Sequence, residues 1–328
     1  MRKARSSFRY FPDASFTRSL CHSELCGPWP GMTAEELDDM RALMLEHAAF
    51  SCIRILAFSL RPAAFDILIE SPNNLKLTKK QILARIDDGY SNYSNEARDA
   101  VLAELKSGGP AALERVSSKF VSVSSFFKRF KQVVARSYHR RRNTTGTLWQ
   151  TRYDSAFVEP GNASRVVAAW VDHGCVRDGM VDSPEKNPHC TIGWAAAGGL
   201  PAREMIRGIF LEGKPDANWP VAHKAWRNFC SGEPESPLTR PNNIARKPPL
   251  TRAELLRHVM LHFRTGLAIG SHDFIERLFV LNRDYFDYDR ELGARFITGQ
   301  NDPDLFTFRD KGDLRKPLRS ARMRSIHG

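Results

Sequence analysis

The chain has 328 residues, of which 42% are hydrophobic and 26% charged, and this composition excludes general disorder. Its 49 Lys and Arg against 37 Asp and Glu give a net charge of +12, which favours a polyanionic partner such as nucleic acid or an anionic membrane surface. No stretch approaches the roughly 18 apolar residues of a membrane span, and the basic N-terminus lacks the apolar core of a signal peptide, so we expect a cytoplasmic protein without membrane partners.

The first third of the chain predicts a strand, a helix and two further strands. Residues 15–25 have strand character, and Thr33 with Glu36 forms the Thr-x-x-Glu capping box that begins a helix. The segments 50–60 and 61–70 predict two strands joined by a tight turn at an Arg-Pro pair. The expected order is therefore strand, helix, strand, strand.

The middle of the chain predicts more helices and one more strand. Residues 73–118 are helical in pattern with a Gly-Gly-Pro break, and a second capped helix runs from Ser122 to about Arg142. Residues 148–160 return to strand character, and 162–174 predict a further helix. Together these elements predict an α+β fold in which helices pack against an antiparallel sheet.

Breaks in composition divide the chain into four expected segments. The stretch 232–249 holds five prolines and almost no apolar periodicity, which indicates a linker. After it, two amphipathic helices joined by residues 264–270 predict a small helical domain. The expected segments are a basic N-terminal arm at 1–14, the main α+β domain at 15–198, a partly helical connector with the Pro-rich linker at 199–249, and a helical C-terminal domain with a basic tail at 250–328.

The second capped helix is strongly basic. From Arg115 to Tyr153 the sequence has ten Lys or Arg and no Asp or Glu, so the cations have no acidic neighbours along the chain. Such a helix packs by one face and tracks phosphates with the other, although a plain solvated basic surface is the alternative. The expected nucleic-acid contacts are Lys128, Arg129, Lys131, Arg136, Arg140, Arg141, Arg142 and Arg152.

Tyr138 lies on the apolar stripe of this helix with Phe130 and Val134. This spacing favours a packing role. The surrounding arginines also lower the cost of forming a phenolate, which keeps a nucleophilic role open.

Four stretches together resemble the REP-associated tyrosine transposases, a family of single-tyrosine HUH transposases. They are "LAFSLRPAAFDILIESP", "SSFFKRFKQVVARSYHRRRNTTGTLWQTRYDSAFVE", "WVDHGCVRDGMVDSPEKNPHCTIGWAAAGG" and "GLAIGSHDFIERLFVLNRDYF". The most specific mark is Gly-Thr-Leu-Trp at 146–149 followed by Arg152. The resemblance implies a ferredoxin-like antiparallel sheet with packed helices, within the main domain at 15–198 and followed by the small helical C-terminal domain predicted above.

The resemblance also implies a catalytic apparatus. In this family two histidines on one strand hold Mg²⁺ or Mn²⁺ at a scissile phosphate, and a helical tyrosine attacks that phosphate. The histidine positions correspond to Ala64 and Asp66 here. The nucleophile corresponds to Tyr138, or to Ser137 in members that place it one residue earlier.

These replacements predict a degenerate metal site. Ala64 offers no ligand and Asp66 offers one carboxylate, so Asp66 is at most a vestigial or weak metal ligand, with His22 or His139 as substitutes for the missing one. We therefore expect a transposase-like, nucleoid-associated protein that binds single-stranded or hairpin DNA, without a cofactor and with catalysis lost or weakened. An active enzyme using Tyr138 with Mg²⁺ or Mn²⁺, and an RNA-binding protein, are the alternatives; a homodimer stays open.

Other chemistry-bearing residues give weaker signals. His258 and His262 have a zinc-ligand spacing but no third ligand, so we expect surface histidines. Trp149 and Trp170 have apolar neighbours and are expected to pack rather than to stack on bases. Six cysteines without a Cys-x-x-Cys pair are expected to be reduced packing residues.

Overall fold

A seven-stranded sheet is the centre of the computed structural model, which describes residues 8–89, 95–150, 152–214, 216–231, 256, 263, 267–286, 289–297 and 305–308. The strand order is β2-β3-β1-β4-β5-β7-β6. β1 pairs antiparallel with both β3 and β4, whereas β4 and β5 are parallel, so the sheet is mixed. The strands are β1 (Phe16–Glu24), β2 (Arg54–Arg61), β3 (Ala64–Pro72), β4 (Asp154–Val158), β5 (Ala268–Gly270), β6 (Arg295–Phe296) and β7 (Phe306–Thr307).

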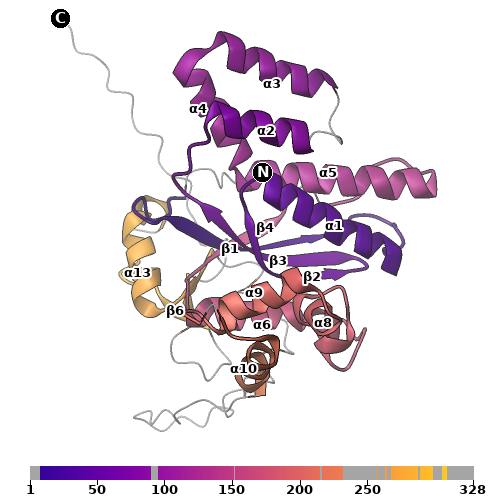
Figure 1. Cartoon of the computed structure of the whole chain (residues 1–328). Helices are drawn as coiled ribbons and strands as arrows, with labels where there is room; N and C mark the ends of the chain where they lie inside the picture. The colour runs from indigo at the N-terminus through magenta and orange to yellow at the C-terminus, as the bar shows by residue number, and fades with distance from the viewer. Residues whose placement is uncertain are drawn as a thin grey trace, which may run out of the picture.

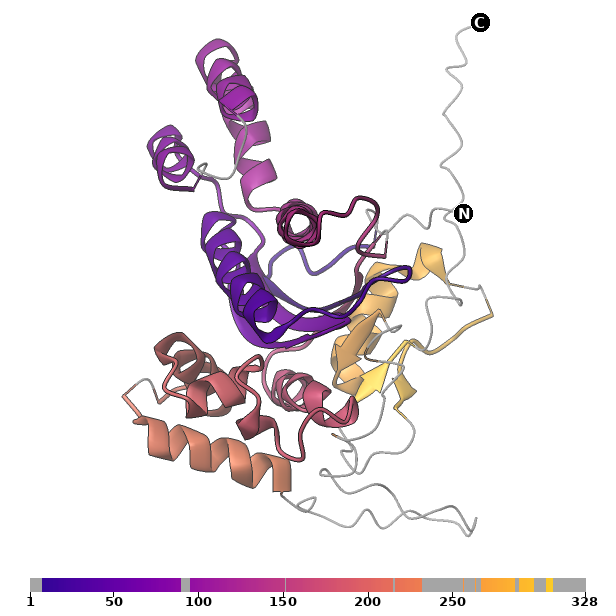
Figure 2. The same ribbon diagram turned by 90° about the vertical axis from the view of Figure 1, so that its right-hand side faces the viewer.

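Helices cover both faces of this sheet (Figures 1 and 2). On one face lie α1 (Ala34–Phe50) and α5 (Val123–Arg142). On the other lie α6 (Asn162–Asp172), α7 (Gly174–Arg177), the 3₁₀ turn Pro184–Lys186, α8 (Thr191–Ala196), α9 (Leu200–Phe210) and α10 (Trp219–Ser231). A helical extension made of α2 (Lys79–Gly89), α3 (Asn95–Ser107) and α4 (Gly109–Phe120) projects from the sheet in Figure 1.

The predicted order of elements up to α6 is confirmed. Thr33 and Glu36 form the reciprocal capping box of α1, and the Ser122 hydroxyl accepts a hydrogen bond from Ser125 N at the start of α5. Strands β1 to β4 with α1 and α5 form the β-α-β-β-α-β arrangement with sheet order β2-β3-β1-β4, which is the ferredoxin-like layout. The expected α+β class and its antiparallel core are therefore correct.

Side chains alternate along β1, and this divides the core into two layers. Cys21 belongs to the apolar cluster under α1 and α5, together with Phe65 of β3. Leu20 belongs to the cluster under α6, together with Leu68 of β3. Because successive residues of a strand point to opposite faces, the odd-numbered residues of β1 and β3 face α5 and the even-numbered residues face α6.

The expected helical C-terminal domain is wrong for the residues that the structure describes. Residues 268–270 form β5, which pairs with β4, and β6 and β7 extend the same sheet beside α13 (His272–Leu281) and the 3₁₀ turn Arg283–Tyr285. Strands of two or three residues are too short to show a period of two in sequence. The predicted linker at 232–249 lies outside the described residues. So does nearly all of the helix predicted at 250–263.

The expected connector is also part of the main body. α9 and α10 contribute Ile206 and Trp226 to the cluster under α6, so residues 199–231 complete that layer of the core. No helix in the described part of the chain combines the length and the apolar character needed to span a bilayer.

Replacement of Phe65 by Ala should destabilise the fold by about 3–5 kcal/mol, because a large buried ring leaves a cavity. Phe65 is fully buried, with its ring centroid 5.6 Å from that of Phe130 and 5.3 Å from that of Trp149. Urea denaturation measures the loss. The control Val280→Ala removes a side chain that is 72% exposed and should change stability by less than about 0.5 kcal/mol; a similar effect of both variants would contradict this assignment of the core.

Candidate functional site

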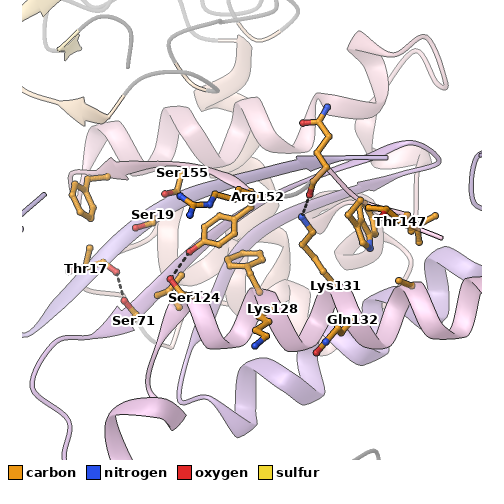
Figure 3. A pocket seen from close by; sticks show the side chains of 18 of the residues that line it. Thr17, Ser19, Ser71, Ser124, Lys128, Lys131, Gln132, Thr147, Arg152 and Ser155 are labelled. Atoms are coloured by element: carbon orange, nitrogen blue, oxygen red, sulfur yellow. Dashed lines mark hydrogen bonds between the residues drawn. The ribbon is translucent and has the colours of Figure 1, made fainter. Parts of the chain in front are cut away.

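A groove of about 1010 Å³ lies between α5 and the sheet, bordered by residues 146–150, 152 and 153 (Figure 3). Among the residues that the structure describes, its cations are Lys128, Lys131 and Arg152, and no Asp or Glu lines it. Seven hydroxyl side chains line it: Thr17, Ser19, Ser71, Ser124, Thr147, Tyr153 and Ser155. A surface of this composition offers hydrogen bonds and positive charge without a competing negative charge.

Two periodicities build the groove. Along β1, Thr17 and Ser19 stand on the face toward α5 because they are two residues apart on a strand. Along α5, Ser124, Lys128 and Lys131 are three or four residues apart and therefore share one face of the helix. The groove is formed where these two faces meet.

Lys131 forms a positively charged part of the groove wall. Its ammonium donates hydrogen bonds to Ser23 Oγ at 2.9 Å and to the Gln150 carbonyl oxygen at 2.8 Å. Burial lowers the pKa of Lys131 to about 8, against the weaker opposing effects of Cys26 and Asp154. Most copies therefore remain charged at pH 7, in a partly desolvated position where an anion is attracted more strongly than in bulk water.

The other predicted contacts of the basic helix divide into two groups. Lys128, Arg136 and Arg140 on α5 are exposed, and so is Arg152 after it. Of these, Lys128 and Arg152 line the groove, while Arg136 and Arg140 lie outside its lining. These four cations, with Lys131, remain the predicted contacts to an anionic partner.

The remaining arginines are engaged within the protein. Arg141 pairs with Glu35 at 3.2 Å and also with Asp39. Arg142 pairs with Glu36 and donates to the Gly31 carbonyl oxygen at 3.2 Å. The absence of nearby acids in the sequence was misleading here, because the acids come from α1.

Arg129 is engaged as well. Its guanidinium donates to the Ser125 carbonyl oxygen and to Ser51 Oγ, both at 3.2 Å, and lies 4.8 Å from the centroid of the Phe50 ring. Arg129, Arg141 and Arg142 thus anchor α5 to its neighbours, which corrects their expected role as freely available cations.

Tyr138 is a packing residue in this structure. Its side chain is 2% exposed, and its hydroxyl donates a hydrogen bond to the Pro30 carbonyl oxygen at 2.7 Å. Burial raises the pKa of Tyr138, which is opposite to the shift that a phenolate nucleophile requires. Neither Tyr138 nor its neighbour Ser137 lines the groove.

Asp66 lies on the other side of the sheet. It shares its face of β3 with Leu68, under α6, whereas Tyr138 packs in the cluster that includes Phe65 and Ile67. The structure therefore does not bring the predicted nucleophile and the predicted metal ligand together.

The Asp66 carboxylate is fully buried and fully engaged. Oδ2 accepts from the Arg61 guanidinium at 2.6 Å, and Oδ1 lies 2.7 Å from His22 Nδ1, since His22 is its partner residue on β1. Burial alone would raise the pKa of Asp66, but Arg61 and the His22 hydrogen bond outweigh it and hold this pKa well below its usual range. Ala64 is buried beside this cluster and adds no donor atom.

These residues do not fit a divalent cation. Both Asp66 oxygens already have hydrogen-bond partners, and Arg61 supplies the positive charge that a metal ion would otherwise supply. Of the two histidines considered as substitutes for the missing metal ligand, His22 does lie next to Asp66. The other, His139, lies on the α5 side and is hydrogen-bonded to Thr144 at 2.8 Å. Within the described residues, no group of three or more His, Cys, Asp or Glu side chains is arranged to hold a metal ion.

The two tryptophans and the histidine pair considered in the sequence analysis can be compared with the structure. Trp170 is fully buried, with the Arg177 guanidinium 3.8 Å from its ring centroid, so its predicted packing role is confirmed. Trp149 packs in the core under α5 and also borders the groove. His258 and His262 lie outside the described residues.

The hydroxyl side of the groove was missed from the sequence. Thr17, Ser19 and Ser23 alternate along β1, so a polar strand face was visible in the letters "FTRSLCHSE". Such alternation usually indicates a solvent-facing side of a sheet. Only the position of α5 over this face makes it the wall of a groove.

Comparisons with known proteins give little further information. No protein-family model matches the chain, and no curated protein matches it in sequence. A solved structure, that of a REP-associated tyrosine transposase bound to a REP hairpin, is similar over 61% of this chain and 88% of its own. The TM-score is 0.40 and the identity 12%, and a likeness at this level supports no inference about the fold or the function of this chain.

Replacement of Arg61 by Met should destabilise the protein by about 3–5 kcal/mol at pH 7, because it leaves the buried Asp66 carboxylate without its cation. In the wild type the pKa of Asp66 is lower in the folded state than in the unfolded state. Its contribution to the free energy of unfolding is therefore fully present above the unfolded-state pKa and is lost as the pH falls toward the folded-state pKa. Without Arg61 the carboxylate takes up a proton more readily, so the cost of the substitution should shrink toward pH 4.5.

Urea denaturation of both proteins at pH 7 and pH 4.5 measures this difference. The matched control Arg54→Met removes an arginine that is 69% exposed and pairs with Glu70, and it should cost less than about 1 kcal/mol. An Arg61→Met cost that is the same at both pH values would contradict the ion-pair assignment.

Proposed function

We propose that this chain binds single-stranded or hairpin DNA in the groove between α5 and the sheet. The observation that carries the proposal is the lining itself, in which the described residues supply three cations, seven hydroxyl groups and no carboxylate. Phosphate contacts in nucleic-acid complexes come mainly from Lys, Arg and hydroxyl side chains. The net charge of +12 adds a long-range attraction for any polyanion.

The dimensions and aromatic residues of the groove favour an unpaired strand. Its volume of about 1010 Å³ is near the upper end of about 300–1,000 Å³ for small-molecule pockets, so it suits a few nucleotides rather than a duplex. Tyr153 is half-buried and lines the groove, so part of its ring is available to a base.

Two considerations select DNA and a non-catalytic role. The Gly-Thr-Leu-Trp element at 146–149, which resembles that of DNA transposases, lies on the border of the groove. The residues at the positions of the family's catalytic groups have other tasks, since Asp66 is bound to Arg61 and Tyr138 to Pro30. We therefore propose that tyrosine-based cleavage is lost, and that the protein acts by binding, in a cytoplasmic and nucleoid-associated location.

Removal of two groove cations should weaken DNA binding and its dependence on salt. In the double variant Lys128→Ala/Arg152→Ala, the affinity for a hairpin with a single-stranded extension should fall, and the slope of log K against log salt should decrease by about 1.4–1.8, because each phosphate contact contributes about 0.7–0.9. Fluorescence anisotropy at several salt concentrations measures both quantities.

A matched control carries the same change in charge on the opposite side of the molecule. Lys214→Ala/Lys224→Ala removes two exposed cations near and on α10, outside the groove, and should leave most of the affinity intact. Equal losses in the two double variants would contradict the groove as the binding site. Stronger binding of a matched RNA hairpin would contradict the choice of DNA.

The loss of cleavage has a direct test. Incubation with a labelled hairpin DNA and Mn²⁺ should give no covalent protein-DNA adduct on a denaturing gel. Tyr138→Phe should lose the hydrogen bond to Pro30, at a cost of about 1 kcal/mol, and should bind the hairpin as the wild type does. A wild-type adduct that disappears in Tyr138→Phe would instead show that Tyr138 is a nucleophile.

A further inference from the structure

Hydroxyl side chains from three strands converge at one end of the groove. Thr17 and Ser19 come from β1, Ser71 from β3 and Ser155 from β4, and Ser124 of α5 faces them (Figure 3). The pairing of Thr17 with Ser71 in the β1-β3 register places these strands side by side here. This hydroxyl end is distinct from the end near Thr147, at the other side of Figure 3.

Ser19 is the unusual member of the hydroxyl end. It is only 7% exposed, it lines the groove, and its hydroxyl has no hydrogen-bond partner in the described part of the chain. Thr17, by contrast, donates to Asn73 Oδ1 at 2.6 Å. Because Ser19 lines the groove, its hydroxyl hydrogen is available to a ligand or to water from the groove.

The N-terminus of α5 supplies further donors at the same end. Ser122 caps the helix through Ser125 N at 3.2 Å, and Phe126 N donates to the Ser122 carbonyl oxygen at 2.9 Å. The amides of Val123 and Ser124 have no acceptor among the described residues, and both residues line the groove. A helix of 20 residues carries a partial positive charge at this terminus, which favours an anion.

We propose that the hydroxyl end binds a phosphate monoester, the terminal phosphate of a nucleic-acid strand whose adjoining nucleotides occupy the rest of the groove. The inference rests on the proposed function. A monoester carries about −1.5 to −2 charge and three acceptor oxygens, which matches an end where the Ser19 hydroxyl and the amides of Val123 and Ser124 offer donors, whereas Thr17 and Ser71 donate within the protein. Lys128, one helical turn from Ser124, adds positive charge.

The lining also favours a strand terminus over an internal phosphodiester. Phe8, Phe157 and Leu267 border the groove as well, and they belong to the apolar cluster around α13. These side chains offer no donor to the next phosphate of a continuing strand. A strand that ends among the hydroxyls leaves no charged group against this apolar border.

Three single-stranded oligonucleotides of one sequence test the inference, with a 5′-phosphate, a 3′-phosphate or hydroxyl groups at both ends. Fluorescence anisotropy should show about tenfold tighter binding of one phosphorylated form, since a hydrogen bond to a charged group contributes about 1.5–3 kcal/mol. Ser19→Ala should abolish this preference, so that the variant binds the phosphorylated and unphosphorylated strands with equal affinity. The matched control Thr147→Ala, at the other end of the groove, should keep the preference.

Each contrary outcome has a distinct meaning. Equal affinity for all three strands overturns the terminal-phosphate site but leaves DNA binding in the groove intact. A preference that persists in Ser19→Ala places the phosphate elsewhere and also overturns the inference. If none of the strands binds, the proposed function fails and the inference with it.

Calorimetric titration with inorganic phosphate alone distinguishes a strand terminus from a free ion. We expect binding weaker than that of the phosphorylated strand, since the groove contacts are missing. If inorganic phosphate binds as tightly as the phosphorylated oligonucleotide, the site takes the free ion and the assignment to a strand terminus is overturned.

Discussion

The alternation of side chains along β1 is the constraint on which both polar regions of this protein depend. β1 is hydrogen-bonded to β3 on one side and to β4 on the other, so its register is fixed twice. Ser19 and Ser23 face α5, while Leu20 and His22 face α6. A slip of one residue would bury the groove hydroxyls under α6 and turn His22 toward the groove, so packing of the two apolar layers also fixes the polar chemistry.

The ion pairs of α5 give its basic sequence two different uses. At the C-terminal end Arg141 and Arg142 pair with acids in the first turns of α1, and these contacts hold the two helices together over the sheet. Toward the N-terminal end Lys128 and Lys131 face the groove. One helix thus combines arginines that pair with α1 and lysines that line the groove, so the number of cations in its sequence overstates the positive charge that a ligand can meet.

The cluster of Arg61, Asp66 and His22 shows how a buried carboxylate is kept ionised without a metal ion. The guanidinium offers a positive charge in fixed geometry at 2.6 Å, and Asp178 lies 3.3 Å from its other end. Breaking such a buried pair is costly because one charge stays behind. The arrangement therefore has a structural reason to persist, whatever the partner bound on the opposite face of the sheet.

The sequence by itself determined the order of elements from β1 to α6, both helix caps and the α+β class, because capping and periodicity depend on residues within about four positions. It also located Lys128 and Lys131 on a packed basic helix. Only the tertiary structure decided that Arg141 meets Glu35, that Asp66 meets Arg61 and His22 away from Tyr138, and that β5 joins the sheet. Except for Arg61, these partners come from distant segments, and which side chains meet across a sheet or between helices depends on strand pairing and packing that no local pattern records.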